Sequence, residues 1–213
     1  MKNIADLLYQ IPILLFTLTI HEYSHGRVAY YLGDDTAKRA GRLTLNPISH
    51  IDPLGLLMLF IVHIGWAKPV PINPYNFKDY KRDTAITAAA GPVSNFIVAI
   101  ILSLIFNFLR GIIPIEHLMS GSSRFIFTML YYAVLINLAL GIFNLIPIPP
   151  LDGSKILGGF LTDRQYSRYA ARERDGAMIL MIIFAADYLL RLGLIRAIIE
   201  IPLKFFLSLL LNI

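Results

Sequence analysis

Two long stretches without a charged residue constrain the fold of this chain more than any other feature of its sequence. They cover residues 84–109 and residues 125–151. Each is longer than the about 20 apolar residues that an α-helix needs to cross the hydrocarbon core of a bilayer. Charged residues make up only 15% of the chain, whereas soluble domains carry about 25%. We therefore expect two transmembrane helices and a lipid bilayer as the surrounding medium.

Two other parts of the chain have a less uniform pattern. Residues 4–32 are apolar as far as Ile20 and then become polar, so we expect a helix that stops near Gly33. Residues 37–83 contain an apolar stretch that is too short for a comfortable crossing and has prolines on both sides. Irregular backbone at membrane depth needs cover from protein or a wet cavity. We therefore expect a re-entrant or β element there, with residues 42–45 as a short strand.

The C-terminal part begins with basic residues and ends in two short apolar helices, expected over residues 176–190 and 197–213. The expected fold is all-α and integral to the membrane. It has a three-helix catalytic core with the re-entrant or β element, followed by the two C-terminal helices. We place the core in residues 1–160 and the C-terminal segment in residues 161–213.

The basic residues predict how the chain lies in the membrane. Residues 33–83 hold seven of the 19 Lys and Arg residues, and residues 152–175 hold five. Because cytoplasmic loops are enriched in Lys and Arg, both regions should face the cytoplasm of a multi-pass protein of the cell membrane. The net charge of +5 does not indicate a nucleic-acid partner, because the basic residues lie between apolar runs and form no continuous stripe.

A histidine pair near the end of the first helix indicates a metal site. His21-Glu22-Tyr23-Ser24-His25 matches the pattern H-E-x-x-H, in which the two imidazoles share one helix face and Glu22 lies beside them. Such a pattern can also be a polar turn at a helix end. Ionisable groups inside a membrane helix are costly and usually functional, however. The chain has no cysteine, so His21 and His25 predict one zinc ion, with Glu22 as the general base for a water molecule.

A catalytic zinc site needs a third protein ligand. In some zinc proteases with this motif the third ligand is a Glu further along the chain. No Glu lies between Glu22 and Glu116 here, so another residue must be the third ligand. The candidates are Asp152, His50, Asp52, His63 and His117. His117 should lie on the outer side and is remote. Asp152 follows a charge-free helix at the same cytoplasmic depth as the histidines, in a Pro-Leu-Asp-Gly turn that could aim its carboxylate inward.

The chain resembles the site-2 proteases, zinc metalloproteases that cut their substrates within the membrane. Three motifs, in the order of that family, carry the resemblance: His21-Glu22-Tyr23-Ser24-His25, Gly91-Pro92-Val93-Ser94-Asn95 and Asn144-Leu145-Ile146-Pro147-Ile148-Pro149-Pro150-Leu151-Asp152-Gly153. It looks like the compact form of the family, without PDZ or CBS modules. The resemblance implies that Asp152 is the third zinc ligand and that Asn95 contacts the substrate or the developing oxyanion. It also implies that the substrates are transmembrane proteins or peptides.

Three polar residues have competing interpretations. The amide of Asn95, inside an apolar helix, could act in catalysis or form a helix–helix hydrogen bond beside Gly91. Asn144 could bind substrate or satisfy carbonyl groups freed by the prolines that follow it. His50 could bind substrate, donate to an oxyanion, act in a gate or be an ordinary loop residue.

The competing functional class is a non-hydrolytic metal-binding membrane protein or transporter. Glu22 separates the two classes, because transport needs ligands but no positioned general base. The sequence does not predict the oligomeric state.

Overall fold

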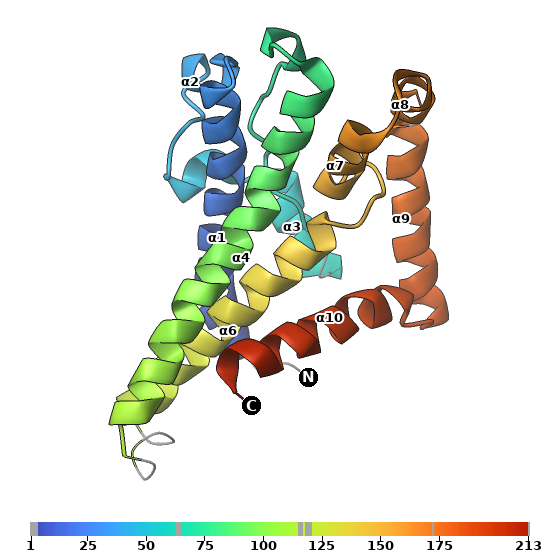
Figure 1. Cartoon of the computed structure of the whole chain (residues 1–213). Helices are drawn as coiled ribbons and strands as arrows, with labels where there is room; N and C mark the ends of the chain where they lie inside the picture. The colour runs from blue at the N-terminus through green and yellow to red at the C-terminus, as the bar shows by residue number, and fades with distance from the viewer. Residues whose placement is uncertain (1–3, 63–64, 115–116, 118–120, 172, 213) are drawn as a thin grey trace.

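The computed structural model describes residues 4–62, 65–114, 117, 121–171 and 173–212, and these are mostly helical. Three long helices, α1 (Ile4–Tyr31), α4 (Tyr80–Ile112) and α6 (Gly121–Asn144), pack side by side (Figure 1). The shorter helices are α2 (Thr36–Arg39), α3 (Pro53–Val62), α7 (Asp152–Phe160), α8 (Asp163–Ala170), α9 (Glu173–Leu190) and α10 (Leu194–Leu211). The expected helical fold with a three-helix centre is therefore confirmed.

The two central apolar helices end where local chemistry dictates. The side chain of Asp79 caps α4 by accepting a hydrogen bond from the Arg82 N–H at 3.0 Å. Helix α6 ends at Asn144, well before the charge-free stretch does, because prolines lack the N–H that a helix interior needs. Among the described residues, α4 and α6 are both long and apolar enough to cross a membrane.

Helix α10 packs across α4 and α6 part-way along their length (Figure 1). Its residues Leu207 and Leu211 are buried in the same apolar cluster as Val134 and Leu138 of α6. Asn107 of α4 donates to the carbonyl group of Leu210 at 2.6 Å. This bond satisfies one of the carbonyl groups that a helix leaves unpaired at its C-terminal end.

The segment between α2 and α4 differs from the expectation. The described part of the chain contains no strand, and residues 42–45 have no regular structure. The nearest feature to a β element is one antiparallel bridge between Ile51 and Ala67, with the Lys68 N–H donating to the His50 carbonyl at 2.9 Å. Longer pairing is prevented because prolines on both sides of the bridge cannot donate to a ladder. The β element is thus not confirmed, and a re-entrant position for α3 stays a prediction.

Two polar side chains hold the loop before α4 against the end of α1. Asp34, fully buried, accepts hydrogen bonds from the Asn73 N–H and the Asn76 amide, both at 2.7 Å. Burial raises the pKa of Asp34, but hydrogen bonds from Thr36, Asn73 and Asn76 outweigh it and lower the pKa overall. Arg42 donates to the carbonyl groups of Lys68 at 2.8 Å and Pro69 at 3.2 Å. The loop is therefore fixed at both ends.

Candidate metal centre

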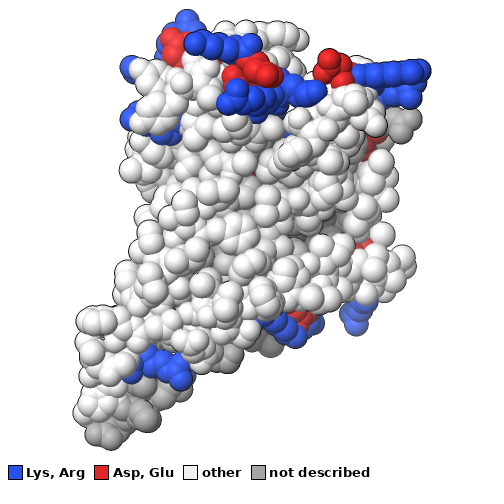
Figure 2. Space-filling model, in the orientation of Figure 1, with Lys and Arg blue, Asp and Glu red and all other residues white. Residues whose placement is uncertain are grey.

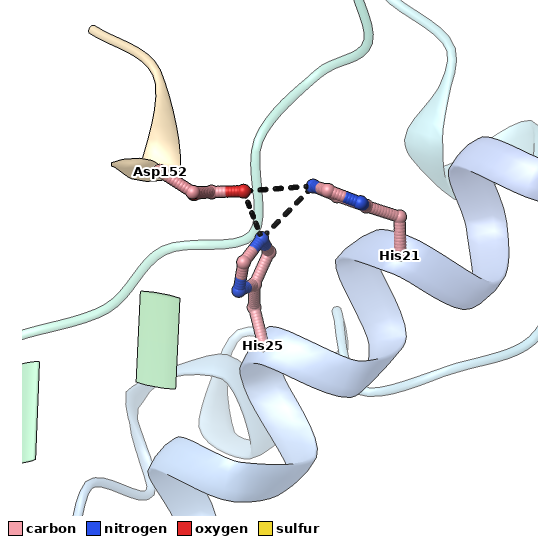
Figure 3. Close-up of side chains that lie close together, drawn as sticks. All are labelled: His21, His25 and Asp152. Atoms are coloured by element: carbon pink, nitrogen blue, oxygen red, sulfur yellow. Dashed lines mark hydrogen bonds and ion pairs between the residues drawn. The ribbon is translucent and has the colours of Figure 1, made fainter. Parts of the chain in front are cut away.

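Two histidines from one helix and a carboxylate from another meet at the centre of the molecule. His21 and His25 lie one turn apart on α1, and their Nε2 atoms are 3.0 Å apart. Asp152 is the first residue of α7, and its Oδ2 lies 3.1 Å from Nε2 of His21 and 3.2 Å from Nε2 of His25 (Figure 3). Both histidines are buried, at 4% and 7% exposure.

Hydrogen bonds on the far side of each imidazole determine which nitrogen faces the centre with a lone pair. Nδ1 of His25 lies 2.8 Å from the carbonyl oxygen of Thr87, and Nδ1 of His21 lies 2.6 Å from Oδ1 of Asn95. Because oxygens of this type only accept, both Nδ1 atoms must carry a proton. In neutral imidazoles the Nε2 lone pairs then point at Asp152 Oδ2, a buried atom with no hydrogen-bond donor.

Three lone pairs that converge without a proton between them are an arrangement suited to a cation. The separations of 3.0 to 3.2 Å between the three atoms are close to the about 3.3 Å implied by a tetrahedral zinc ion with bonds of about 2.0–2.1 Å. Two imidazoles and a carboxylate are ligands that zinc accepts, and three protein ligands leave a fourth position open. His21, His25 and Asp152 could therefore hold one zinc ion.

Asp152 reaches this position because the chain turns sharply after α6. Pro147 to Leu151 form a non-helical turn that returns the chain toward α1. At Gly153 an added Cβ would lie 2.2 Å from the carbonyl oxygen of Leu145, so a side chain has no space. Asp152 can therefore place its carboxylate at the centre because Gly153, which has no side chain, packs directly on the backbone of Leu145.

Gly91 of α4 is a site residue whose full importance the sequence did not show. A Cβ there would lie 2.4 Å from Nε2 of His25 and 2.6 Å from Nε2 of His21. Real Cβ contacts essentially never fall below 3.0 Å. The sequence indicated Gly91 only as a point of close helix packing, and its four-residue spacing from Asn95 was the available signal, because both face α1.

A cavity of about 530 Å³ opens beside the three ligands. Glu22 and Asn144 also line it, together with Trp66, Pro69 and Val70 of the loop before α4. The Val70 N–H donates to Oε2 of Glu22 at 2.8 Å, which fixes the carboxylate in the cavity wall. The arrangement thus combines a metal site, a carboxylate that can take a proton and space for a ligand.

The other predicted residues are placed as follows. Asn144 donates to its own helix, at the Leu140 carbonyl, at 3.1 Å. Asn95 is fully buried and contacts His21 rather than the cavity. His50 is buried outside the cavity lining, with Nε2 2.8 Å from the Thr44 carbonyl. The catalytic role of Asn95 and the substrate-binding roles of Asn144 and His50 stay predictions.

Two further ligand candidates are not part of the group. Asp52 accepts a hydrogen bond from the Gly55 N–H at 2.8 Å, at the start of α3. His117 lies between α4 and α6, beyond the described end of α4. His63 lies outside the described residues. Of the candidates that the structure describes, Asp152 is the one that meets His21 and His25.

A histidine pair on a helix, a carboxylate from a second helix and a glutamate in the same cavity define the metallohydrolase class of site. The sequence model of a protein family described as peptidase family M50 matches residues 73–186 of this chain. The chain belongs to this family, the site-2 proteases, and is a zinc metalloprotease. The competing class, a non-hydrolytic metal-binding protein or transporter, is therefore set aside.

Similar proteins come from bacteria and archaea. The chain is 36% identical to "Putative zinc metalloprotease YwhC" of Bacillus subtilis, over 83% of this chain and 80% of that protein. It is 27% identical to "Zinc metalloprotease MJ0392" of Methanocaldococcus jannaschii, over 81% of this chain and 41% of that protein. No solved structure matches the chain.

Proposed function

We propose that this protein is an intramembrane protease that hydrolyses peptide bonds of membrane-embedded proteins or peptides. His21, His25 and Asp152 bind one zinc ion, and Glu22 is the general base. The observation that supports this most directly is the convergence of three buried lone pairs on the wall of a cavity that also contains a carboxylate. Family membership supports the zinc and the peptide-bond chemistry.

The residues divide the reaction between them. Zinc, when bound, supplies a Lewis acid that lowers the pKa of a water molecule toward about 7. Glu22 takes the proton of the attacking water and later gives it to the leaving amine nitrogen. The Val70 N–H holds Glu22 in the cavity wall, and Asn144 lies on the same wall, where its amide would contact the substrate backbone.

The proposed membrane position rests on the surface of the central helices. Large apolar residues of α4 are exposed along the helix, among them Ile97, Ile101, Leu104, Ile105 and Phe108. Such a surface needs cover from lipid or from another apolar surface. Figure 2 shows Lys and Arg gathered at one end of the molecule, over α2, the start of α4 and α8, with a nearly uncharged middle. This basic end would face the cytoplasm.

Labelling of a single cysteine tests this orientation. Ser167 of α8 is exposed at the basic end, and the chain has no cysteine of its own, so Ser167→Cys gives one reactive thiol. We expect an impermeant maleimide to label it in inverted vesicles or lysed cells but not in intact cells. Labelling in intact cells would contradict the proposed orientation.

Zinc content and cleavage, measured together, test the proposed ligands. Purified wild-type protein should contain about one zinc ion per chain. Asp152→Ala should lose zinc affinity by more than the about 10–100-fold that outer-shell changes cost, together with cleavage of a membrane-embedded reporter. Asp52→Asn is the matched control, because Asp52 caps α3 away from the cavity. Full zinc content and activity in Asp152→Ala would show that the ligand set is wrong.

A further inference from the structure

A chain of buried hydrogen bonds runs from His21 away from the cavity into the three-helix core. Oδ1 of Asn95 on α4 lies 2.6 Å from Nδ1 of His21. Nδ2 of Asn95 donates to Oδ1 of Asn137 on α6 at 3.1 Å, and Nδ2 of Asn137 donates to the Thr17 hydroxyl on α1 at 3.0 Å. Thr17, Asn95 and Asn137 are all fully buried, at 0% exposure. None of the three lines the cavity.

Two backbone carbonyl groups determine the direction of these hydrogen bonds, that is, which side-chain atom of each asparagine donates and which accepts. Nδ2 of Asn95 also lies 3.4 Å from the carbonyl oxygen of Thr17, and Nδ2 of Asn137 lies 2.8 Å from that of Ala133. A carbonyl oxygen only accepts, so the amide nitrogen of each asparagine must face it. The amide oxygen of Asn137 then faces Asn95, and the amide oxygen of Asn95 faces His21.

The direction of these hydrogen bonds determines which ring nitrogen of His21 carries the proton. An oxygen 2.6 Å from Nδ1 requires the proton on Nδ1 and leaves the lone pair on Nε2, which faces Asp152 and His25. If the Asn95 amide rotated, its NH₂ group would face Nδ1 and favour the opposite tautomer, which cannot bind a metal through Nε2. The orientation of one amide therefore decides whether His21 can be a ligand.

We propose that Asn137 and Thr17 are positioning residues for the metal centre, acting on His21 through Asn95. This inference rests on the proposed function, because it assumes that His21 binds zinc. It gives α6 a part in orienting a metal ligand, although none of its residues is among the three ligands. It also gives Asn95 a role other than contact with substrate. Outer-shell partners of metal-binding histidines typically change metal affinity or activity by about 10–100-fold.

Substitutions at Thr17 test this proposal with little change in shape. Thr17→Val removes the hydroxyl group and keeps the β-branched volume, whereas Thr17→Ser keeps the hydroxyl group. Thr19→Val is the matched control, because Thr19 is also buried on α1, at 3% exposure, and its hydroxyl donates to Leu15 of its own helix at 2.6 Å. Asn137→Leu, with a similar volume, removes both bonds of the Asn137 amide nitrogen and the oxygen that accepts from Asn95. The readouts are zinc affinity by chelator competition, the visible spectrum of the cobalt-substituted protein, and thermal stability.

We expect Thr17→Val to weaken zinc binding about 10-fold and Asn137→Leu up to about 100-fold, both with an altered cobalt spectrum. Thr17→Ser and Thr19→Val should resemble the wild type. Unchanged zinc affinity and an unchanged cobalt spectrum in Thr17→Val and Asn137→Leu would overturn the proposal. This holds even if their thermal stability is lower, because the hydrogen bonds would then only stabilise the packing of the helices. A wild-type protein that binds no zinc would instead overturn the proposed function, and this inference with it.

Discussion

Gly91→Ala should abolish zinc binding and proteolysis together. The added methyl carbon would lie 2.4 Å from His25 Nε2 and 2.6 Å from His21 Nε2, the atoms proposed to bind the metal. Neither imidazole can move away freely, because Thr87 and Asn95 hold the other side of each ring. We expect zinc content near zero and no measurable cleavage. Metal analysis and a reporter assay in liposomes provide the two measurements.

Gly111→Ala is the matched control for this substitution. Gly111 lies on the same helix, and a Cβ there meets no atom within 4 Å. Alanine also favours a helix more than glycine does, by about 1 kcal/mol, so the control should fold and cleave like the wild type. A Gly91→Ala variant with one zinc ion and normal activity would mean that α4 does not pass this close to the two histidines.

The second large effect is expected from Glu22→Gln, which should greatly reduce the rate of peptide-bond cleavage without changing the zinc content. Glutamine keeps an oxygen that can accept the Val70 N–H, but it cannot take a proton from water. Loss of a general acid–base typically costs about 10²–10⁴-fold in rate. Zinc content should be unchanged, because Glu22 is not one of the three converging ligands. Single-turnover cleavage of a reporter, in detergent and in liposomes, measures the effect.

The control for Glu22→Gln is Glu200→Gln, which removes a carboxylate of α10 that pairs with Arg196 and Lys204 away from the cavity. It should cleave at the wild-type rate. Near-normal cleavage by Glu22→Gln would exclude Glu22 as the base. Loss of zinc in that variant would assign Glu22 a structural role.

Local patterns predicted the parts of the structure that depend on neighbours in sequence. The i, i+4 spacing of His21 and His25 suffices to place both rings on one helix face. Charge-free stretches predicted α4 and α6, and the prolines before Asp152 explain why α6 ends at Asn144. The three-motif resemblance identified Asp152, which spacing alone had left as one of several candidates.

What the sequence did not predict depends on contacts between distant segments. Asn137 also lies inside a charge-free apolar stretch, but that signal does not show that it faces Asn95 and Thr17 across helix boundaries. The strand expected at residues 42–45 is not observed, since a strand needs a partner and the single bridge nearby joins Ile51 to Ala67 instead. The hydrogen bond between Val70 and Glu22 spans 48 residues of sequence and also depends on tertiary packing.

The cavity beside the three ligands has a consequence for the supply of the second reactant. Each peptide bond cut consumes one water molecule, which the hydrocarbon core of a bilayer does not provide. A volume of about 530 Å³ is many times the about 30 Å³ that one water occupies in the liquid. Thr84 lines the cavity and belongs to the first turns of α4, the end of that helix at the basic surface (Figure 1). Turnover would then depend on rehydration of this space from that surface after each product leaves.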